Sequence, residues 1–149
     1  MASHSYPSNY GTFPAYANAP KVYLALWEAQ YPVPQLDVLA GNALKVLRKY
    51  ARVFPIGQPR ALLWQGLHAW LAGKPSKAHE AWRKSLAEAD RLDMPYDQGL
   101  AHFEIGRHLE KDDPNRREHL THACEIFDRL GTTPDLDLSR QELAPVQRT

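Results

Sequence analysis

A helical hairpin that occurs twice, in altered form, constrains the fold of this chain more than any other feature of its sequence. The tripeptide Asp-Arg-Leu closes one predicted helix at residues 90–92 and another at residues 128–130, thirty-eight residues further on. Small residues occupy corresponding points inside the preceding helices: Gly66, Ala78 and Ala81 in the first unit, and Gly106 and Ala123 in the second. A period in the thirties, with two helices per unit, indicates a stacked helical repeat. Each unit of such an array completes its core with its neighbours, so we expect the chain to present surfaces rather than an enclosed active site.

Apolar residues at helical spacing run through most of the chain. The longest run extends from Leu36 to Phe54 at intervals of three and four residues and ends at Pro55. Similar runs on either side predict about six helices, and no segment has the alternating pattern of a strand. We therefore expect an all-α fold, a tetratricopeptide-like array of helix-turn-helix repeats that forms a short α-solenoid over residues 15–131.

The spacing of small and aromatic residues in the first unit indicates the type of repeat. Gly66 is followed by Ala78 after 12 residues and by Trp82 after 16, in agreement with the tetratricopeptide pattern. We expect Gly66 and Ala78 to lie where the two helices approach most closely, with Trp82 filling the space beside them. The same intervals from Gly106 reach Glu118 and His122 instead, so the second unit should have an interhelix loop of a different length.

Turn-forming residues predict where the domain begins and ends. Pro20 suits the first turn of a helix better than its interior, so we expect the first helix to begin near Ala19. Asp113–Pro114 predicts the start of the last helix, because Asp can cap a helix and Pro fits its first turn. Outside the domain, residues 1–14 are expected to form a flexible arm rich in aromatic residues and proline, and residues 132–149 a disordered tail.

Charge is distributed unevenly along a chain whose formal net charge is only +1. No acidic residue lies between Val38 and His79, whereas residues 80–149 hold 15 acidic and 10 basic residues. The sharpest cluster is a basic stripe whose spacing places it on one side of a helix: Lys45, Arg48, Lys49 and Arg52. This basic stripe is either a solvated helix face or a binding surface for an acidic peptide, an acidic domain or phosphate groups. Arg60 and Trp70 are further candidates for contact with a partner, and nucleic acid is not expected because the acidic second half opposes it.

Three sequence blocks resemble a known class of proteins. They are YARVFPIGQPRA at residues 50–61, MPY followed by GLAHFEIGRHL within residues 94–109, and VYLALWE at residues 22–28. Together they resemble the C-terminal tetratricopeptide-like region of large bacterial signalling proteins, which join a class III adenylate or guanylate cyclase domain to an AAA-type or STAND-type ATPase. The resemblance covers about residues 16–131 and implies a regulatory helical region. No catalytic residue carries over, because the sequence contains none of the cyclase or ATPase motifs.

The residue types needed for catalysis or metal binding do not converge in the sequence. A phosphate-binding loop needs a shorter interval than the one between Gly66 and Gly73, and Ser or Thr directly after its Lys, where this chain has Pro. His119 and His122 could coordinate a metal ion from one helix face, but a zinc site needs one or two further ligands that converge on the ion. Ser85 with a nearby histidine could be imagined as a nucleophile, although its place among small residues favours packing. We therefore expect no catalytic residue, no cofactor and no metal.

The compartment is indicated by cysteine usage and by the first residues. The single cysteine, Cys124, excludes an internal disulfide and fits a reducing compartment, and we expect it to be buried and inert. Residues 1–20 contain no Lys or Arg and no apolar centre of a signal peptide. No apolar run is long enough to span a membrane. We expect a cytoplasmic protein without membrane contact.

These observations favour a non-catalytic helical-repeat module for protein–protein interaction or regulation, with a protein or peptide as its partner. One alternative is a structural module that forms homo-oligomers through an apolar end of the array. A second alternative is an accessory part of a nucleotide cyclase or ATPase, which would bind a nucleotide.

Overall fold

Consecutive helices pair into antiparallel hairpins. The computed structural model describes residues 13–145, and the predictions for residues 1–12 and 146–149 lie outside this range. Within it the chain forms seven α-helices, one short 3-10 turn at Pro55–Gly57 and no strand, so the expected all-α fold is confirmed for the described residues. The α-helices are α1 (Phe13–Glu28), α2 (Leu36–Val53), α3 (Gln58–Leu71), α4 (Pro75–Arg91), α5 (Pro95–Arg107), α6 (Pro114–Leu130) and α7 (Thr133–Leu143).

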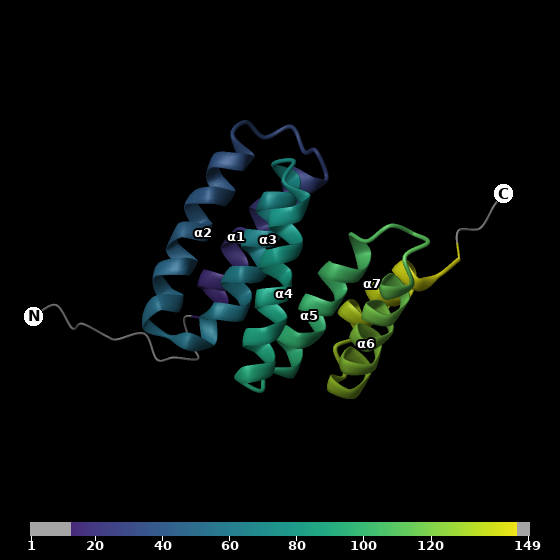
Figure 1. Cartoon of the computed structure of the whole chain (residues 1–149). Helices are drawn as coiled ribbons and strands as arrows, with labels where there is room; N and C mark the ends of the chain where they lie inside the picture. The colour runs from purple at the N-terminus through teal and green to yellow at the C-terminus, as the bar shows by residue number, and fades with distance from the viewer. Residues whose placement is uncertain (1–12, 146–149) are drawn as a thin grey trace, which may run out of the picture.

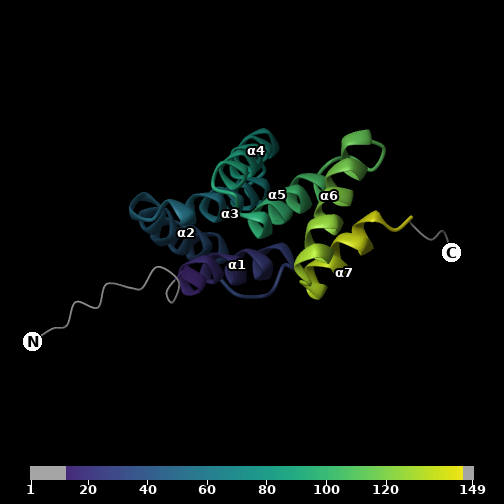
Figure 2. The same cartoon turned by 90° about the horizontal axis from the view of Figure 1, so that it is seen from below.

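Three hairpins follow one another along the chain, and each packs against the next (Figure 1). α1 packs on α2, α3 on α4 and α5 on α6, while α7 adds a last layer on α6. Between the hairpins, α3 contacts both α1 and α2, and α5 contacts both α3 and α4. Figure 2 shows α1 lying along α2 and α3 at one end of the molecule and α7 along α6 at the other.

A close approach inside the second hairpin lies between Gly66 of α3 and Trp82 of α4. A Cβ atom at Gly66 would overlap the indole ring of Trp82. That ring is wholly buried and donates its Nε1–H to the carbonyl of Leu63 at 3.1 Å. Ala78 is also fully buried. The contact expected from the sequence spacing is confirmed, and it requires glycine because any larger residue would displace the indole.

The third hairpin makes two such approaches and has a longer loop. Two glycines of α5 face large side chains of α6: Gly99 faces Phe127, and Gly106 faces Leu120. The loop between α5 and α6 covers residues 108–113, whereas the loop between α3 and α4 covers only residues 72–74. The expected difference in loop length is therefore confirmed. Asp113 also caps α6 as expected, because its side chain accepts a hydrogen bond from the backbone N–H of Asn115 at 2.8 Å.

The expected start of the first helix is wrong. α1 begins at Phe13 rather than near Ala19, so Pro20 lies inside the helix. The rings of Phe13 and Tyr16 pack on Tyr50 of α2, with centroid distances of 5.7 and 5.0 Å. The ring of Pro20 is itself fully buried. These aromatic and apolar contacts, which depend on another helix, offset the helical hydrogen bond that Pro20 cannot make.

The expected disordered tail is wrong for residues 133–143, which form α7. Leu136 of α7 packs against Phe127 of α6. The hydroxyl of Tyr96 in α5 donates a hydrogen bond to Asp135 at 3.1 Å. Few apolar residues of α7 face the core, so its helical period is too weak to be recognised in the sequence.

Two further expectations concern the burial of Cys124 and the absence of a membrane-spanning segment. Cys124 is only partly buried, and this burial raises the pKa of its thiol, which disfavours the reactive thiolate. None of the helices between residues 13 and 145 combines the length and the apolar composition that crossing a membrane requires.

Candidate functional site

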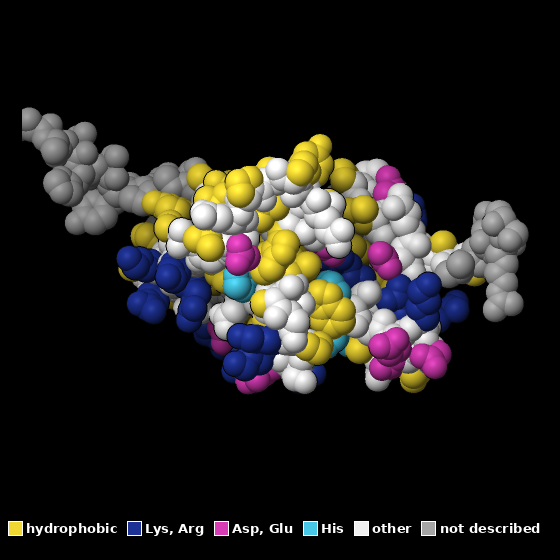
Figure 3. Space-filling model, turned by 90° about the horizontal axis from the view of Figure 1, so that it is seen from above, with side chains coloured by type: hydrophobic (Ala, Val, Ile, Leu, Met, Phe, Trp, Pro, Cys, Tyr) yellow, Lys and Arg dark blue, Asp and Glu magenta, His cyan; other side chains and the backbone are white. Residues whose placement is uncertain are grey.

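The basic stripe lies on the outer face of α2. The opposite side of this helix is buried and consists of Leu36, Ala40, Leu44, Leu47, Tyr50 and Ala51. All four cationic side chains of the basic stripe are exposed. Figure 3 shows a dark-blue cluster of Lys and Arg side chains at the left edge of the molecule, the edge that α2 occupies in Figure 1. The placement on one side of a helix that the spacing predicts is therefore found in the structure.

The basic stripe makes no ion pair or side-chain hydrogen bond among residues 13–145. The ion pairs in this part of the chain join other side chains. The acidic residue of α2 is Asp37, in its first turn, and the next acid along the chain is Glu80. Like charges on neighbouring turns of a helix repel one another, so the outer face of α2 keeps a positive field that a ligand can neutralise.

A hollow of about 200 Å³ lies beside the basic stripe, between α2 and α3. Arg48 and Arg52 line it from α2, and Gln58 and Gln65 line it from α3. Leu62 supplies part of its apolar wall. Two guanidinium groups beside one hollow can donate several charge-assisted hydrogen bonds to a carboxylate or phosphate.

Arg60 does not belong to this surface, in contrast to the expectation that it contacts a partner. Its Nε lies 3.0 Å from Oδ1 of Asp97 in α5, and its side chain is only 11% exposed. The guanidinium group also lies over the rings of Phe13 and Tyr96, at 5.5 and 5.4 Å from their centroids. Arg60 therefore ties α3 to α1 and α5. Sequence reasoning missed this role because Asp97 lies 37 residues away along the chain.

Trp70 is likewise a packing residue. Its ring is partly buried and lies 6.0 Å from the ring of Trp82 and 4.6 Å from that of His108. His79 packs edge-on against it at 5.9 Å. Burial, together with the neighbouring charge of Arg107, lowers the pKa of His108 to about 4. This group of rings joins α3, α4 and the end of α5 and leaves Trp70 outside the basic stripe.

A partly buried charge network connects the first and third hairpins. Arg107 of α5 pairs with Glu104 on its own helix at 2.9 Å and with Glu28 at the end of α1 at 2.6 Å. Burial raises the pKa of Glu104, although Arg107 acts in the opposite direction. Burial alone would lower the pKa of Arg107, but the two carboxylates outweigh it and raise that pKa. The i,i+3 pair of Glu104 and Arg107 is visible in the sequence, whereas nothing there points to Glu28.

Three histidines meet between α5 and α6. The Nδ1 atoms of His102 and His119 are 2.9 Å apart, and the rings of His102 and His122 stack with centroids 5.0 Å apart. Burial lowers the pKa of His102 to about 4, and the other two histidines add to the shift. His119 and His122 thus share a neighbour that the sequence did not connect with them. Within residues 13–145 no group of three side chains is placed to hold a metal ion.

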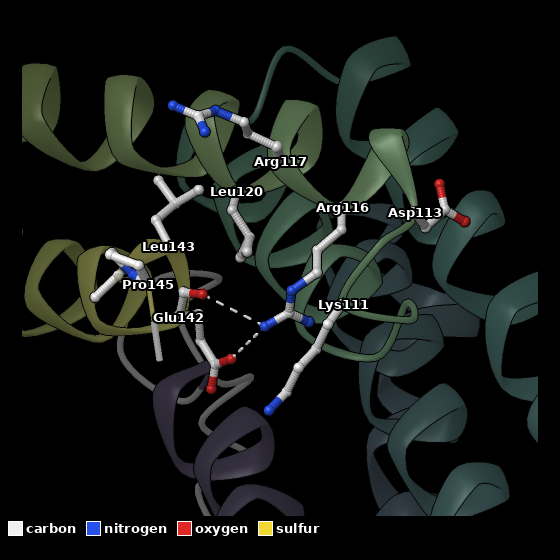
Figure 4. Close-up of a pocket in the computed structure, with 9 residues that line it drawn as sticks. Lys111, Asp113, Arg116, Arg117, Leu120, Glu142, Leu143 and Pro145 are labelled. Carbon is white, nitrogen blue, oxygen red and sulfur yellow. Dashed lines mark hydrogen bonds and ion pairs between the residues drawn. The ribbon is translucent and has the colours of Figure 1, made fainter. Parts of the chain in front are cut away.

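A second hollow, of about 230 Å³, lies at the far end of the array between α6 and α7. Figure 4 shows Arg116 and Glu142 directed toward each other across it, 2.8 Å apart. The other terminal nitrogen of Arg116 donates to three carbonyl groups at the end of α5, those of Gly106, Arg107 and Leu109. Arg116 therefore caps α5 and anchors α7, which leaves little of its bonding capacity for a ligand.

The other chemistry considered from the sequence has structural partners. The hydroxyl of Ser85 is buried and donates to the carbonyl of Pro59 at 2.7 Å, so packing and a hydrogen bond account for it. Gly66 is covered by Trp82, and Gly73 has a φ of 80° in the turn after α3. These two glycines lie at a helix crossing and in a turn, and do not form a phosphate-binding loop.

No family model, no curated protein and no solved structure with which we compared the chain matches it.

Proposed function

We propose that this protein is a non-catalytic, tetratricopeptide-like interaction module that binds an acidic protein segment through the outer face of α2. The observation that carries the proposal is the absence of partners for the basic stripe among the described residues. Like charges on one helix face repel one another. A ligand that carries carboxylates relieves this repulsion when it binds. The positive field of the basic stripe also steers such a ligand to the surface.

The stacking of the hairpins supports a tetratricopeptide-like architecture. α3 contacts both α1 and α5, so the first helices of successive hairpins are neighbours. The tight contact of Gly66 with Trp82 has the spacing of such a repeat. The resemblance to the regulatory region of cyclase–ATPase proteins supports a role in cytoplasmic signalling as part of this proposal.

A non-catalytic role fits the engagement of the reactive side chains. Ser85 bonds to a backbone carbonyl, and Glu104 pairs with Arg107. His102 is held against His119 and His122. The charged side chains of the basic stripe are cations, which bind and orient a ligand rather than exchange protons near neutral pH.

Binding of a labelled peptide rich in Glu and Asp, followed by fluorescence anisotropy, tests the proposal. Replacing Arg48 and Arg52 together by Glu should weaken binding at least about tenfold. The matched control is Lys74→Glu with Lys77→Glu, which reverses two exposed cations outside the basic stripe and gives the same net charge. Equal loss in both double variants would mean that net charge, and not the basic stripe, governs binding. Binding that is unchanged at moderate salt would also contradict the proposal.

Self-association is a second candidate function, favoured by an apolar patch on α1. Val22 is 54% exposed and Tyr31, just after the helix, is 60% exposed. Ala25, Leu26 and Ala29 line a shallow hollow between them. Light scattering over a range of concentrations tests this candidate, with Val22→Asp as the variant that should dissociate any dimer. A strict monomer at high concentration would eliminate it.

A further inference from the structure

The outer face of α2 is apolar as well as cationic. Three exposed valines lie on it: Val38, Val46 and Val53, with exposed fractions of 50%, 49% and 69%. Single apolar side chains on a surface are common, but here the valines adjoin the basic stripe along one helix. An acidic partner that contacted only the cations would leave these valines in water.

The cationic and apolar groups repeat with the same period. Lys45 and Arg52 are seven residues apart, and so are Val46 and Val53. Seven residues correspond to about 10.5 Å along the axis of α2, and the two pairs form two rows that lie about 100° apart around that axis, with Lys49 between them. A second helix that lies along α2 repeats its own side chains over the same distance.

We propose that the acidic segment is an amphipathic helix that lies along α2. Its apolar row packs against Val46 and Val53, and its row of carboxylates lies against Lys45 and Arg52. This inference rests on the proposed function and specifies the chemistry and conformation of the partner.

An extended acidic peptide fits this surface less well. Side chains on one side of an extended chain repeat about every 7 Å. They fall out of register with rows whose members are about 10.5 Å apart. Such a peptide can satisfy some of the cations but does not cover both valines of one row.

An anionic membrane is the other class of occupant for a basic helix face with apolar residues. Helices that bind membranes insert bulky Trp, Phe and Leu side chains below the headgroups. The large apolar side chains exposed on the described outer face of α2 are valines, which extend only a short distance from the backbone. Short side chains beside cations suit close contact with a helix, where side chains interdigitate.

The hollow between α2 and α3 adds an anchor at the edge of the outer face that lies away from Val46 and Val53. Arg48 and Arg52 lie along this edge of the basic stripe, and Gln58 and Gln65 extend the polar lining. Because Arg52 also belongs to the row that the carboxylates face, one Glu of the docked helix can accept hydrogen bonds from its guanidinium group at the mouth of the hollow. This contact fixes the position of the partner along α2.

Two peptides of identical composition test the inference. In the first, Leu and Glu occupy neighbouring rows with a seven-residue period; in the second, the same residues are redistributed so that no side of the helix is apolar. The first peptide should bind the unmodified chain at least about tenfold more tightly in fluorescence anisotropy. The double variant Val46→Ser with Val53→Ser should abolish this advantage, whereas Val22→Ser, which changes an equally exposed valine on α1, should retain it. Circular dichroism checks that each variant is folded.

The outcomes separate this inference from the function on which it rests. One outcome is that both peptides bind equally well and that the double variant Arg48→Glu with Arg52→Glu weakens the binding of both. In that case the proposal of an acidic ligand is supported, and the proposal of an amphipathic helix is wrong. If neither peptide binds, both proposals are wrong. If vesicles of anionic phospholipid bind in a manner that depends on Val46 and Val53 while the peptides do not, the occupant is a membrane surface.

Discussion

The outer face of α2 and the hairpin of α5 and α6 are both rich in charge, and they use it in opposite ways. In the hairpin, Arg107 is held between Glu104 and Glu28, and Arg116 is held by Glu142 and by the end of α5. On α2, the basic stripe has no such partners within the described residues. The number of charges in a segment therefore says little about its role. Their partners decide whether they stabilise the fold or remain available to a ligand.

Of the variants that test this comparison, the replacement of Arg107 by Met should have the largest effect on stability. The carboxylate of Glu104 is only 7% exposed, so removal of its partner leaves a buried charge uncompensated. We expect the free energy of unfolding in urea to fall by about 3 kcal/mol. The control is Lys84→Met, which breaks an exposed pair with Glu80 and should cost far less stability. Similar losses in both variants would show that the charges of the hairpin are as dispensable as those of an open surface.

Acid should weaken the hairpin through His102. Burial and the two neighbouring histidines hold the pKa of His102 at about 4 in the folded chain, below its ordinary value of 6.5. The unfolded chain therefore binds the proton first, and stability that is present above pH 6.5 is lost as the pH falls toward 4. Allowing for partial exposure, the unmodified chain should lose about 2 kcal/mol more than His102→Gln between neutral pH and pH 4. Burial raises the pKa of Glu104, which acts in the opposite direction in both proteins and cancels in the difference.

Urea unfolding at a series of pH values measures this difference. Equal losses in the two proteins would mean that the contact of His102 with His119 and His122 does not control protonation in the hairpin.

Replacing Tyr96 by Phe tests whether a hydrogen bond from α5 helps to hold α7 in place. Burial raises the pKa of Tyr96 to about 12, so its hydroxyl remains a donor to Asp135 over the ordinary pH range. Loss of this hydrogen bond should cost about 1 kcal/mol and speed hydrogen exchange in α7 more than in α3. Tyr31→Phe, which changes an exposed hydroxyl, is the matched control. Unchanged exchange in α7 would indicate that it is held by its apolar contacts alone.

Reversing the charge of Arg48 and Arg52 should have the smallest effect on stability. These side chains are exposed and have no partners among the described residues, so the free energy of unfolding should change by less than about 0.5 kcal/mol. Relief of repulsion from Lys45 and Lys49 can even increase it slightly. A loss well above this value in thermal or urea unfolding would reveal that the basic stripe supports the fold, and the contrast with the hairpin would disappear.

The features that sequence analysis predicted are those set by residues close together in the chain. The contact of Gly66 with Trp82 and the cap at Asp113 follow from short, regular spacings. The basic stripe follows from the helical period of α2 alone. Local rules of this kind require no knowledge of how one hairpin packs on the next.

The features that it missed depend on distant parts of the chain. In the sequence, Arg60 cannot be distinguished from a surface cation, because its partner Asp97 lies on another helix, α5. Glu28 and Arg107 are 79 residues apart, and no periodicity links them. α7 is held by contacts with α5 and α6 rather than by a strong pattern of its own. In each case tertiary packing, and not local preference, determines the role of the residue.

The bridge between Glu28 and Arg107 limits how this array can evolve. In an open array each unit contacts only its neighbours, so units can be inserted or deleted without disturbing the remainder. Here α1 and α5 are joined directly, and a duplicated central hairpin would move them apart by about 10 Å or more. Arg107 would then lose one of its two carboxylates. New specificity can therefore arise more readily by substitution on the outer face of α2 than by changing the number of hairpins.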